Sequence, residues 1–126
     1  PGIYFELTPE HVRVYTGIFS PEKNDLYAMR EEIAENMKEF NKIISNKKFK
    51  EVFGEVKGDK NARLPKEFQE AGGKQSLMYN KKFYVYTTFS PDIIFEEGLE
   101  KKLIEAYKIA EPFAKFLSKP IINIRS

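Results

Sequence analysis

Two short segments near the start of the chain alternate between apolar and other residues, which is the pattern of strands that bury one face. The first covers residues 3–7 (IYFEL) and the second covers residues 12–19 (VRVYTGIF). Between them, Pro9 favours a turn over residues 8–11. One face of the second segment carries Val12, Val14, Thr16 and Ile18, and the other carries Arg13, Tyr15, Gly17 and Phe19. This pattern predicts an antiparallel hairpin.

After the hairpin, the apolar spacing changes to three and four residues, which is typical of one face of an α-helix. Ser20 and Pro21 favour a helix start, with Ser20 as the cap and Pro21 at the first helical position. Asn36 predicts a break between two helices, and Gly54 favours the end of a short third one. The apolar residues with this spacing are Leu26, Met29, Ile33, Met37, Phe40, Ile43, Ile44, Phe49, Val52 and Phe53.

The segment from residue 55 to residue 76 loses this periodicity, because charged residues, Gly and Pro dominate it. We expect a long surface loop there, with at most one helical turn. A short helix over residues 75–79 and a strand over residues 82–88 (KFYVYTT) are expected to follow. Ser90 and Pro91 then supply a second helix-start signal.

The strongest helical pattern covers residues 98–118. Pro112 lies inside it and is expected to kink the helix. The last residues, 121–126 (IINIRS), are expected to add a strand or to fray. The expected buried stripe consists of Leu99, Leu103, Ile104, Tyr107, Ala110, Phe113, Ala114 and Leu117.

Strands and helices do not alternate strictly along the chain, so the sequence predicts an α+β fold. We expect a single domain over residues 1–126. Its small, mostly antiparallel sheet would contain the N-terminal hairpin plus a later strand, packed by amphipathic helices on one face. Three strands make a thin sheet whose edges are exposed unless another segment pairs with them. This is a first indication that part of the fold lies outside these residues.

The composition restricts the chemistry. The 126 residues include no cysteine, which excludes disulfides, thiolate metal sites and a cysteine nucleophile. A reducing cytoplasm is therefore the expected compartment. No apolar run approaches the length of a membrane-spanning helix. The chain begins Pro1-Gly2 without a Met, which suggests a fragment, a processed product or a trimmed chain.

No self-contained catalytic constellation is visible. His11 is the only histidine and falls in the predicted turn, where a solvated side chain is the simplest interpretation. The helical glutamates lie among Lys and Arg off the apolar faces, which favours solvated ion pairs over a catalytic carboxylate pair. Residues 71–76 (AGGKQS) lack the spaced glycine of a phosphate-binding loop. We therefore assign no catalytic residue, no metal site and no cofactor, and whether the protein is an enzyme stays open.

Positive charge is concentrated in the middle of the chain. Residues 47–82 contain ten basic and five acidic side chains, whereas residues 1–46 contain five and eight. Aromatic residues interleave with the basic ones, a mixture that can bind phosphates and stack bases. Nine of the ten basic residues are lysines, which fits solubility better than bidentate phosphate recognition. Binding of phosphate or nucleic acid by this segment is an alternative function.

Several stretches in order resemble the domain of unknown function 2461 family, from about Ile3 to Leu117. They are the YFEL-TPEHV hairpin, SPEK, MREEI with EN and EF, KKFK-EVFG, RLPKEF, KKFYV, and PFAKFL. In RLPKEF, Leu64 and Glu67 replace a Pro and a Gly of the family pattern. The family tends to show a run of glycines where this chain has Tyr15-Thr16-Gly17.

The resemblance implies a set of candidate anion-binding residues, because four basic positions match the family pattern. Arginine presents a fork of donors and lysine a point charge, and together they suit an anion. The alternative is that Pro65 and Phe68 anchor a long loop while the nearby charges are solvated. The four candidate residues are Arg30, Arg63, Lys66 and Lys81.

The resemblance also implies that this chain is the C-terminal part of a longer protein. Family members typically carry an N-terminal portion with N-R-WF and R-D-RFS-DK-PYK segments, and neither occurs here. Three functions remain open: a binding or structural module within a larger protein, a phosphate or nucleic-acid binder, and an enzyme completed by the N-terminal portion. The expected partners are another protein or that N-terminal portion, with no membrane.

Overall fold

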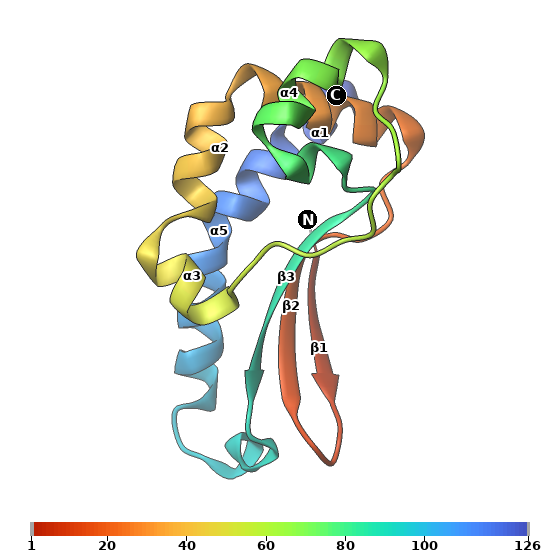
Figure 1. The fold of residues 1–126 in the computed structure, drawn as a ribbon. Coiled ribbons are helices and arrows are strands. Elements are labelled where there is room, and N and C mark those ends of the chain that lie inside the picture. Colours follow the sequence, from red (N-terminus) through yellow and green to blue (C-terminus); the bar gives the residue numbers. More distant parts are fainter. Residues whose placement is uncertain (1, 126) are drawn as a thin grey trace.

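The computed structural model describes residues 2–125, and side chains within 3–121. Three antiparallel strands form one sheet in the order β1-β2-β3 (Figure 1). They are β1 (Gly2–Leu7), β2 (Val12–Ile18) and β3 (Phe83–Phe89). The predicted α+β fold with an antiparallel sheet is confirmed, and the hairpin lies within a residue or two of the expected bounds.

The register of the sheet separates its two faces. Tyr15 of β2 lies opposite Tyr4 of β1 and Tyr86 of β3. Because side chains alternate along a strand, these three tyrosines share one face. Val14 lies opposite Phe5 and belongs to the other face.

The helices follow the apolar spacing of the sequence. The main α-helices are α1 (Lys23–Glu35), α2 (Met37–Ile44), α3 (Lys47–Phe53), α4 (Gln69–Lys74) and α5 (Leu99–Arg125). Short 3₁₀ helices are η1 (Lys66–Phe68), η2 (Ser76–Tyr79) and η3 (Pro91–Phe95). The predicted break at Asn36 is confirmed, since its φ of −124° and ψ of 42° interrupt the helix between α1 and α2. Gly54 ends α3 with a φ of 70°, as expected.

Two expected helix starts have different outcomes. The predicted cap at Ser20 is wrong, because α1 begins after Glu22. The backbone N–H of Glu22 donates to Asp25 Oδ2 at 3.3 Å, so a carboxylate pair replaces the hydroxyl cap. The second expected start is confirmed, because the Ser90 hydroxyl accepts a bond from the Asp92 N–H at 3.4 Å, at the start of η3.

Two other expectations are wrong. Residues 66–74 are helical as η1 followed by α4, which is more than a single turn in a long loop. The tail is neither a strand nor a separate frayed segment, because α5 continues through Pro120 to Arg125. Residue 126 lies outside the described residues. Ile121 is buried against the core and provides the physical reason for the extension, since it repeats the helical spacing of Leu117.

The buried stripe of α5 also differs in part from the prediction. Ile104 and Tyr107 are 48% and 44% exposed, whereas Ala106 is buried. The stripe runs through Ala106 and Ala110, whose small side chains let the helix lie close to β2.

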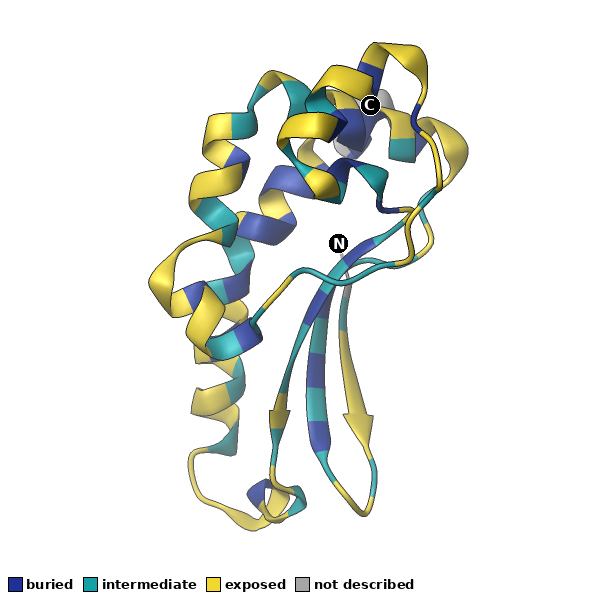
Figure 2. Ribbon diagram, viewed as in Figure 1, coloured by how far each residue is buried: buried dark blue, intermediate teal, exposed yellow. Residues whose placement is uncertain are grey.

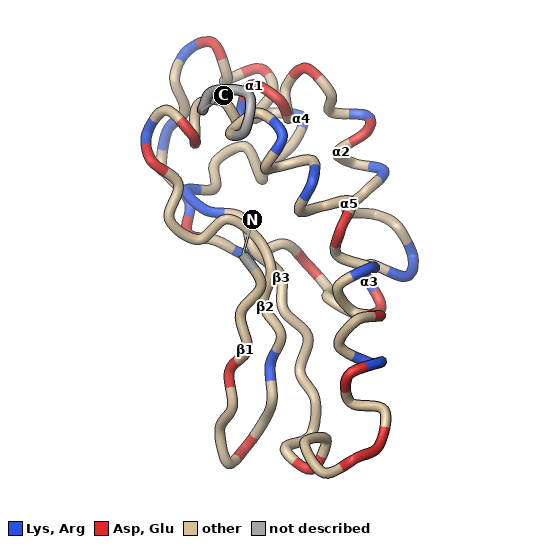
Figure 3. The backbone as a smooth tube through the Cα atoms, turned by 180° about the vertical axis from the view of Figure 1, so that it is seen from behind, with Lys and Arg blue, Asp and Glu red and all other residues tan. Residues whose placement is uncertain are grey.

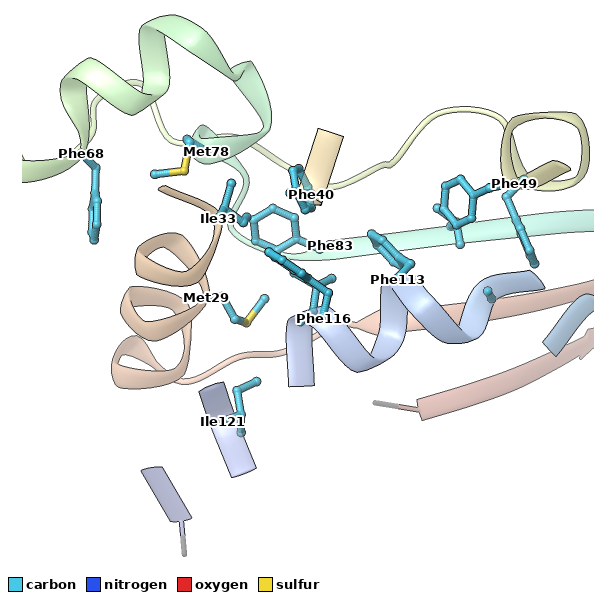
Figure 4. Close-up of a cluster of buried hydrophobic side chains, with 14 of the residues drawn as sticks. Met29, Ile33, Phe40, Phe49, Phe68, Met78, Phe83, Phe113, Phe116 and Ile121 are labelled. Carbon is cyan, nitrogen blue, oxygen red and sulfur yellow. The ribbon is translucent and has the colours of Figure 1, made fainter. Parts of the chain in front are cut away.

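The core lies between the buried face of the sheet and the helices (Figure 2). Phenylalanines from separate helices meet there, as Figure 4 shows. The rings of Phe40 and Phe116 lie 5.4 Å apart between centroids, and those of Phe49 and Phe113 lie 5.5 Å apart. These contacts join α2 and α3 to α5, and such ring pairs stabilise the fold beyond the burial of their area.

Candidate binding surface

The sheet face opposite α5, which we call the open face, carries a cluster of aromatic rings. The rings of Tyr15 and Tyr86 lie 5.1 Å apart between centroids, and those of Phe19 and Tyr84 lie 5.2 Å apart. Tyr4 of β1 meets Phe19 edge-on at 4.9 Å. Tyr4 is 55% exposed and the other four rings are partly exposed. The open face is therefore a half-buried aromatic surface rather than a solvated one.

Two cations contact the same ring of this cluster. The Arg13 guanidinium carbon and Lys57 Nζ each lie 4.8 Å from the Tyr86 ring centroid. Arg13 Nε also donates to the Thr88 hydroxyl at 3.2 Å, and a hydrogen bond with the Tyr15 hydroxyl raises the Arg13 pKa. Such cation–π contacts hold both side chains against the open face.

An acid and the single histidine lie at the turn end of the same face. His11 Nε2 lies 2.6 Å from Glu6 Oε1. The pKa of Glu6 is lowered, chiefly because of this hydrogen bond. An ionised carboxylate only accepts hydrogen bonds, so Nε2 carries the proton that it donates. His11 is therefore a bonded residue of the turn rather than a freely solvated one.

Among residues 2–125, no strand lies beside the outer edge of β1. In the part of the chain that the structure describes, the sheet pairs β1 with β2 alone, and no other backbone hydrogen bond reaches residues 3–7. Figure 2 shows β1 mostly exposed beside β2, whose residues are either buried or intermediate. Phe5 and Leu7 are 52% and 69% exposed on the face that α5 covers elsewhere. Strand β1 therefore exposes apolar side chains on both faces and main-chain groups at its edge.

The opposite edge of the sheet is partly covered. Lys57 pairs with Tyr84 of β3 through two backbone hydrogen bonds of 2.8 and 3.0 Å. The edge of β3 is therefore partly protected by Lys57, whereas the edge of β1 is unpaired.

Gly17 permits the close approach of β2 and β3, because its φ is 144° and a Cβ there would lie 2.2 Å from the Phe83 carbonyl oxygen.

The four predicted anion-binding residues have different environments. Arg30 is buried, and its guanidinium donates to the carbonyl oxygens of Met78, Tyr79 and Asn80. The other three, Arg63, Lys66 and Lys81, are exposed. None of the four lines any of the four hollows around α2, α3, α4 and α5 that the structure describes. A role of the exposed three in anion binding stays a prediction.

The ARLPKEF stretch is anchored by its apolar residues. Leu64 and Phe68 are buried, and the Phe68 ring lies 4.9 Å from that of Tyr27. The expectation that Pro65 anchors this stretch is wrong, because Pro65 is exposed and Leu64 is buried in its place.

Sequence reasoning did not single out the open face as a site. The signal was present, because Arg13, Tyr15 and Phe19 alternate along the second strand and a second Tyr-x-Tyr pattern occurs at Tyr84 and Tyr86. Only the pairing of β2 with β3 brings the two patterns into one cluster.

A protein-family model described as "Conserved hypothetical protein (DUF2461)" matches residues 1–116. The chain belongs to this family. The expected membership is thereby confirmed over most of the chain, and the family description states no activity. No curated protein and no solved structure matches the chain significantly.

No group of three or more His, Asp and Glu side chains in the described part lies close enough to hold a metal ion. No described helix has the length and apolarity needed to cross a membrane.

Proposed function

We propose that this chain is a binding module that docks an extended polypeptide segment along β1. The observation that carries the proposal is the unpaired edge of β1, together with the exposure of Tyr4, Phe5 and Leu7. An added strand would form main-chain hydrogen bonds along this edge, as in other cases of β-augmentation. Alternate side chains of the added strand would then contact the two faces.

Each face offers a different surface to such a segment. On the open face, Tyr4 and Phe19 present aromatic rings. On the other face, Phe5 and Leu7 present apolar side chains that α5 leaves exposed. Specificity would come from the alternating side chains of the docked strand. One set would contact the aromatic rings on the open face, and the other set, aliphatic, would contact Phe5 and Leu7 on the opposite face.

The charge of the sheet favours a polypeptide over a nucleic acid. Glu6 and Arg13 are the only charged residues of the three strands (Figure 3). Arg13 is already bonded to Thr88 and packed on Tyr86. Phosphate backbones need several free cations, whereas tyrosine and arginine are enriched in protein interfaces.

The family resemblance suggests one source of the docked segment. We propose that this chain is the C-terminal part of a longer protein, whose N-terminal portion supplies the strand beside β1. In keeping with the lack of cysteine, we propose a cytoplasmic location.

The test is selection of a library of twelve-residue displayed peptides on this chain. We expect selected peptides to bind and to shift the backbone amide NMR signals of residues 3–7 most strongly. The edge variant, Phe5→Lys with Leu7→Lys, should bind them at least tenfold more weakly, about 1.4 kcal/mol. A matched control is Ile94→Lys with Phe95→Lys, which also replaces two exposed apolar residues.

Equal binding by the edge and control variants would overturn the proposal, as would shifts confined to other elements. The same selection on a longer chain with the N-terminal portion tests the source of the segment. If that portion pairs with β1, the selected peptides should lose access to residues 3–7.

A second candidate is phosphate or nucleic-acid binding by residues 47–82, which is favoured by the exposure of Arg63, Lys66 and Lys81. Fluorescence anisotropy of labelled single-stranded DNA and RNA at two salt concentrations tests it. Binding that weakens steeply with salt and is lost in Arg63→Ala with Lys66→Ala would support it. Salt-independent signals or unchanged binding by that variant would contradict it.

A further inference from the structure

A surface hollow lies where α2, α3 and α5 meet, away from the open face. Its volume is about 360 Å³, at the small end of the range for ligand sites. Eight residues line it: Lys42, Ile43, Asn46, Lys48, Phe49, Lys108, Ile109 and Pro112.

Each of the three helices contributes a lysine followed directly by an apolar residue. The pairs are Lys42-Ile43 from α2, Lys48-Phe49 from α3 and Lys108-Ile109 from α5. The apolar members are buried or partly buried and pack on the core. The lysines are exposed. Neighbouring residues of a helix point in different directions, so the apolar side chains form the floor and the lysines form the rim.

The rim lysines form no ion pair within the described part of the chain. No ion pair involves Lys42, Lys48 or Lys108, whereas Lys50, Lys74, Lys82, Lys102 and Lys115 each lie within 4.0 Å of a carboxylate oxygen. No Asp or Glu lines the hollow. Three like charges around an apolar floor therefore attract a negative group from the solvent.

Hollows on either side carry acidic residues. One is lined in part by Glu51 and Glu105. The other is lined in part by Glu32, Glu39 and Glu111. Lysines also line these two hollows, Lys48 and Lys102 the first and Lys115 and Lys119 the second, but there the carboxylates offset them. Of the three hollows, the central one alone therefore has an excess of positive charge.

We propose that this hollow binds a small amphipathic organic anion, with a compact apolar body and one acidic group such as a carboxylate. The apolar body would cover Ile43, Phe49 and Ile109, and the acidic group would lie among the three lysine ammonium groups. This site is separate from the edge of β1 and does not depend on the proposed peptide docking.

The test is titration of the chain with 2-naphthoate, followed by backbone amide NMR signals. We expect saturable shifts centred on residues 42–49 and 108–112. Two control compounds separate the contributions: 2-naphthalenemethanol has the apolar body without the charge, and inorganic phosphate has charge without the body. Both should bind at least tenfold more weakly than 2-naphthoate.

The rim variant Lys42→Gln, Lys48→Gln, Lys108→Gln should raise the dissociation constant for 2-naphthoate about tenfold. Its matched control is Lys23→Gln, Lys38→Gln, Lys101→Gln, which removes the same charge at exposed helical positions outside the described hollows. Unfolding curves of the two variants should coincide, because all six side chains are exposed.

Equal affinity of the rim and control variants would overturn the proposal. Shifts that map to the open face instead would overturn it as well. Either result would leave the peptide experiment unaffected, since that one reads residues 3–7.

Discussion

Arg30 Nε donates a hydrogen bond of 2.9 Å to the carbonyl oxygen of Met78, which ties α1 to η2 across 48 residues of chain. The same guanidinium donates to the carbonyls of Tyr79 and Asn80 at 3.4 and 3.1 Å. Burial lowers the pKa of Arg30, yet an arginine remains charged at neutral pH. Its charge is satisfied by main-chain oxygens at the end of η2.

Replacing Arg30 with Met should therefore destabilise the fold by about 2–4 kcal/mol, because buried carbonyls lose charged donors. Arg30→Lys should recover only part of this loss, since a lysine cannot reproduce the fork. Urea unfolding checks both variants. The exposed Arg63→Met is the control and should change the free energy of unfolding by no more than about 0.5 kcal/mol. Equal losses at Arg30 and Arg63 would contradict the interpretation.

Arg30 also shows why the candidate site could not be obtained from the sequence. Its match to a family pattern made it a candidate for anion binding, but an arginine can donate equally well to an anion or to a set of carbonyl oxygens. The carbonyls that it binds lie 48 to 50 residues away, and only the tertiary fold brings them together. The hairpin and the break at Asn36 were predictable, because local alternation and spacing determine them.

The end of α5 shows that a local sequence signal can also predict the wrong structure. Pro112 and Pro120 lie inside one helix that continues to Arg125, although prolines disfavour helix interiors. Burial of Leu117 and Ile121 against the core stabilises this last part. Tertiary packing therefore overrides the local signal, as it does where Ala106 replaces Ile104 in the buried stripe.

Two glycine-to-alanine changes should have opposite effects. Gly17→Ala should cost about 2–4 kcal/mol, because the Cβ would lie 2.2 Å from a backbone carbonyl and φ is 144°. Gly73→Ala should stabilise the protein by about 0.5–1 kcal/mol, because Gly73 lies in α4 with nothing within 4 Å of the added carbon. Thermal and urea unfolding of the two variants measure both effects. A Gly17→Ala variant as stable as the wild type would show that strand spacing at Gly17 is not constrained, and a destabilised Gly73→Ala variant would contradict the second expectation.

The Glu6–His11 contact should make stability depend on acid pH. The pKa of Glu6 is lowered in the folded protein, so the stability that this carboxylate contributes is present above its unfolded pKa. It is lost as the pH falls through the lower folded value. The melting temperatures of wild type and Glu6→Gln should therefore differ near pH 6, and the difference should shrink as the pH falls below the unfolded pKa of a glutamate, about 4.3.

Glu10→Gln is the control for this pH series. Glu10 lies in the same turn, and no ion pair of its side chain occurs among the described residues. If both variants follow the same course with pH, the Glu6–His11 bond does not stabilise the turn.

The unpaired edge of β1 should make the isolated chain self-associate at high concentration. An exposed apolar strand edge is a template for pairing with another chain. Phe5→Lys with Leu7→Lys places charge on this edge and should shift sedimentation toward the monomer. The substitutions should leave the urea midpoint nearly unchanged, because both side chains are more than half exposed. Ile94→Lys with Phe95→Lys should leave self-association as it is in the wild type, since η3 offers no strand edge. A reduction of equal size in both variants would mean that general surface hydrophobicity, rather than strand pairing at β1, drives association.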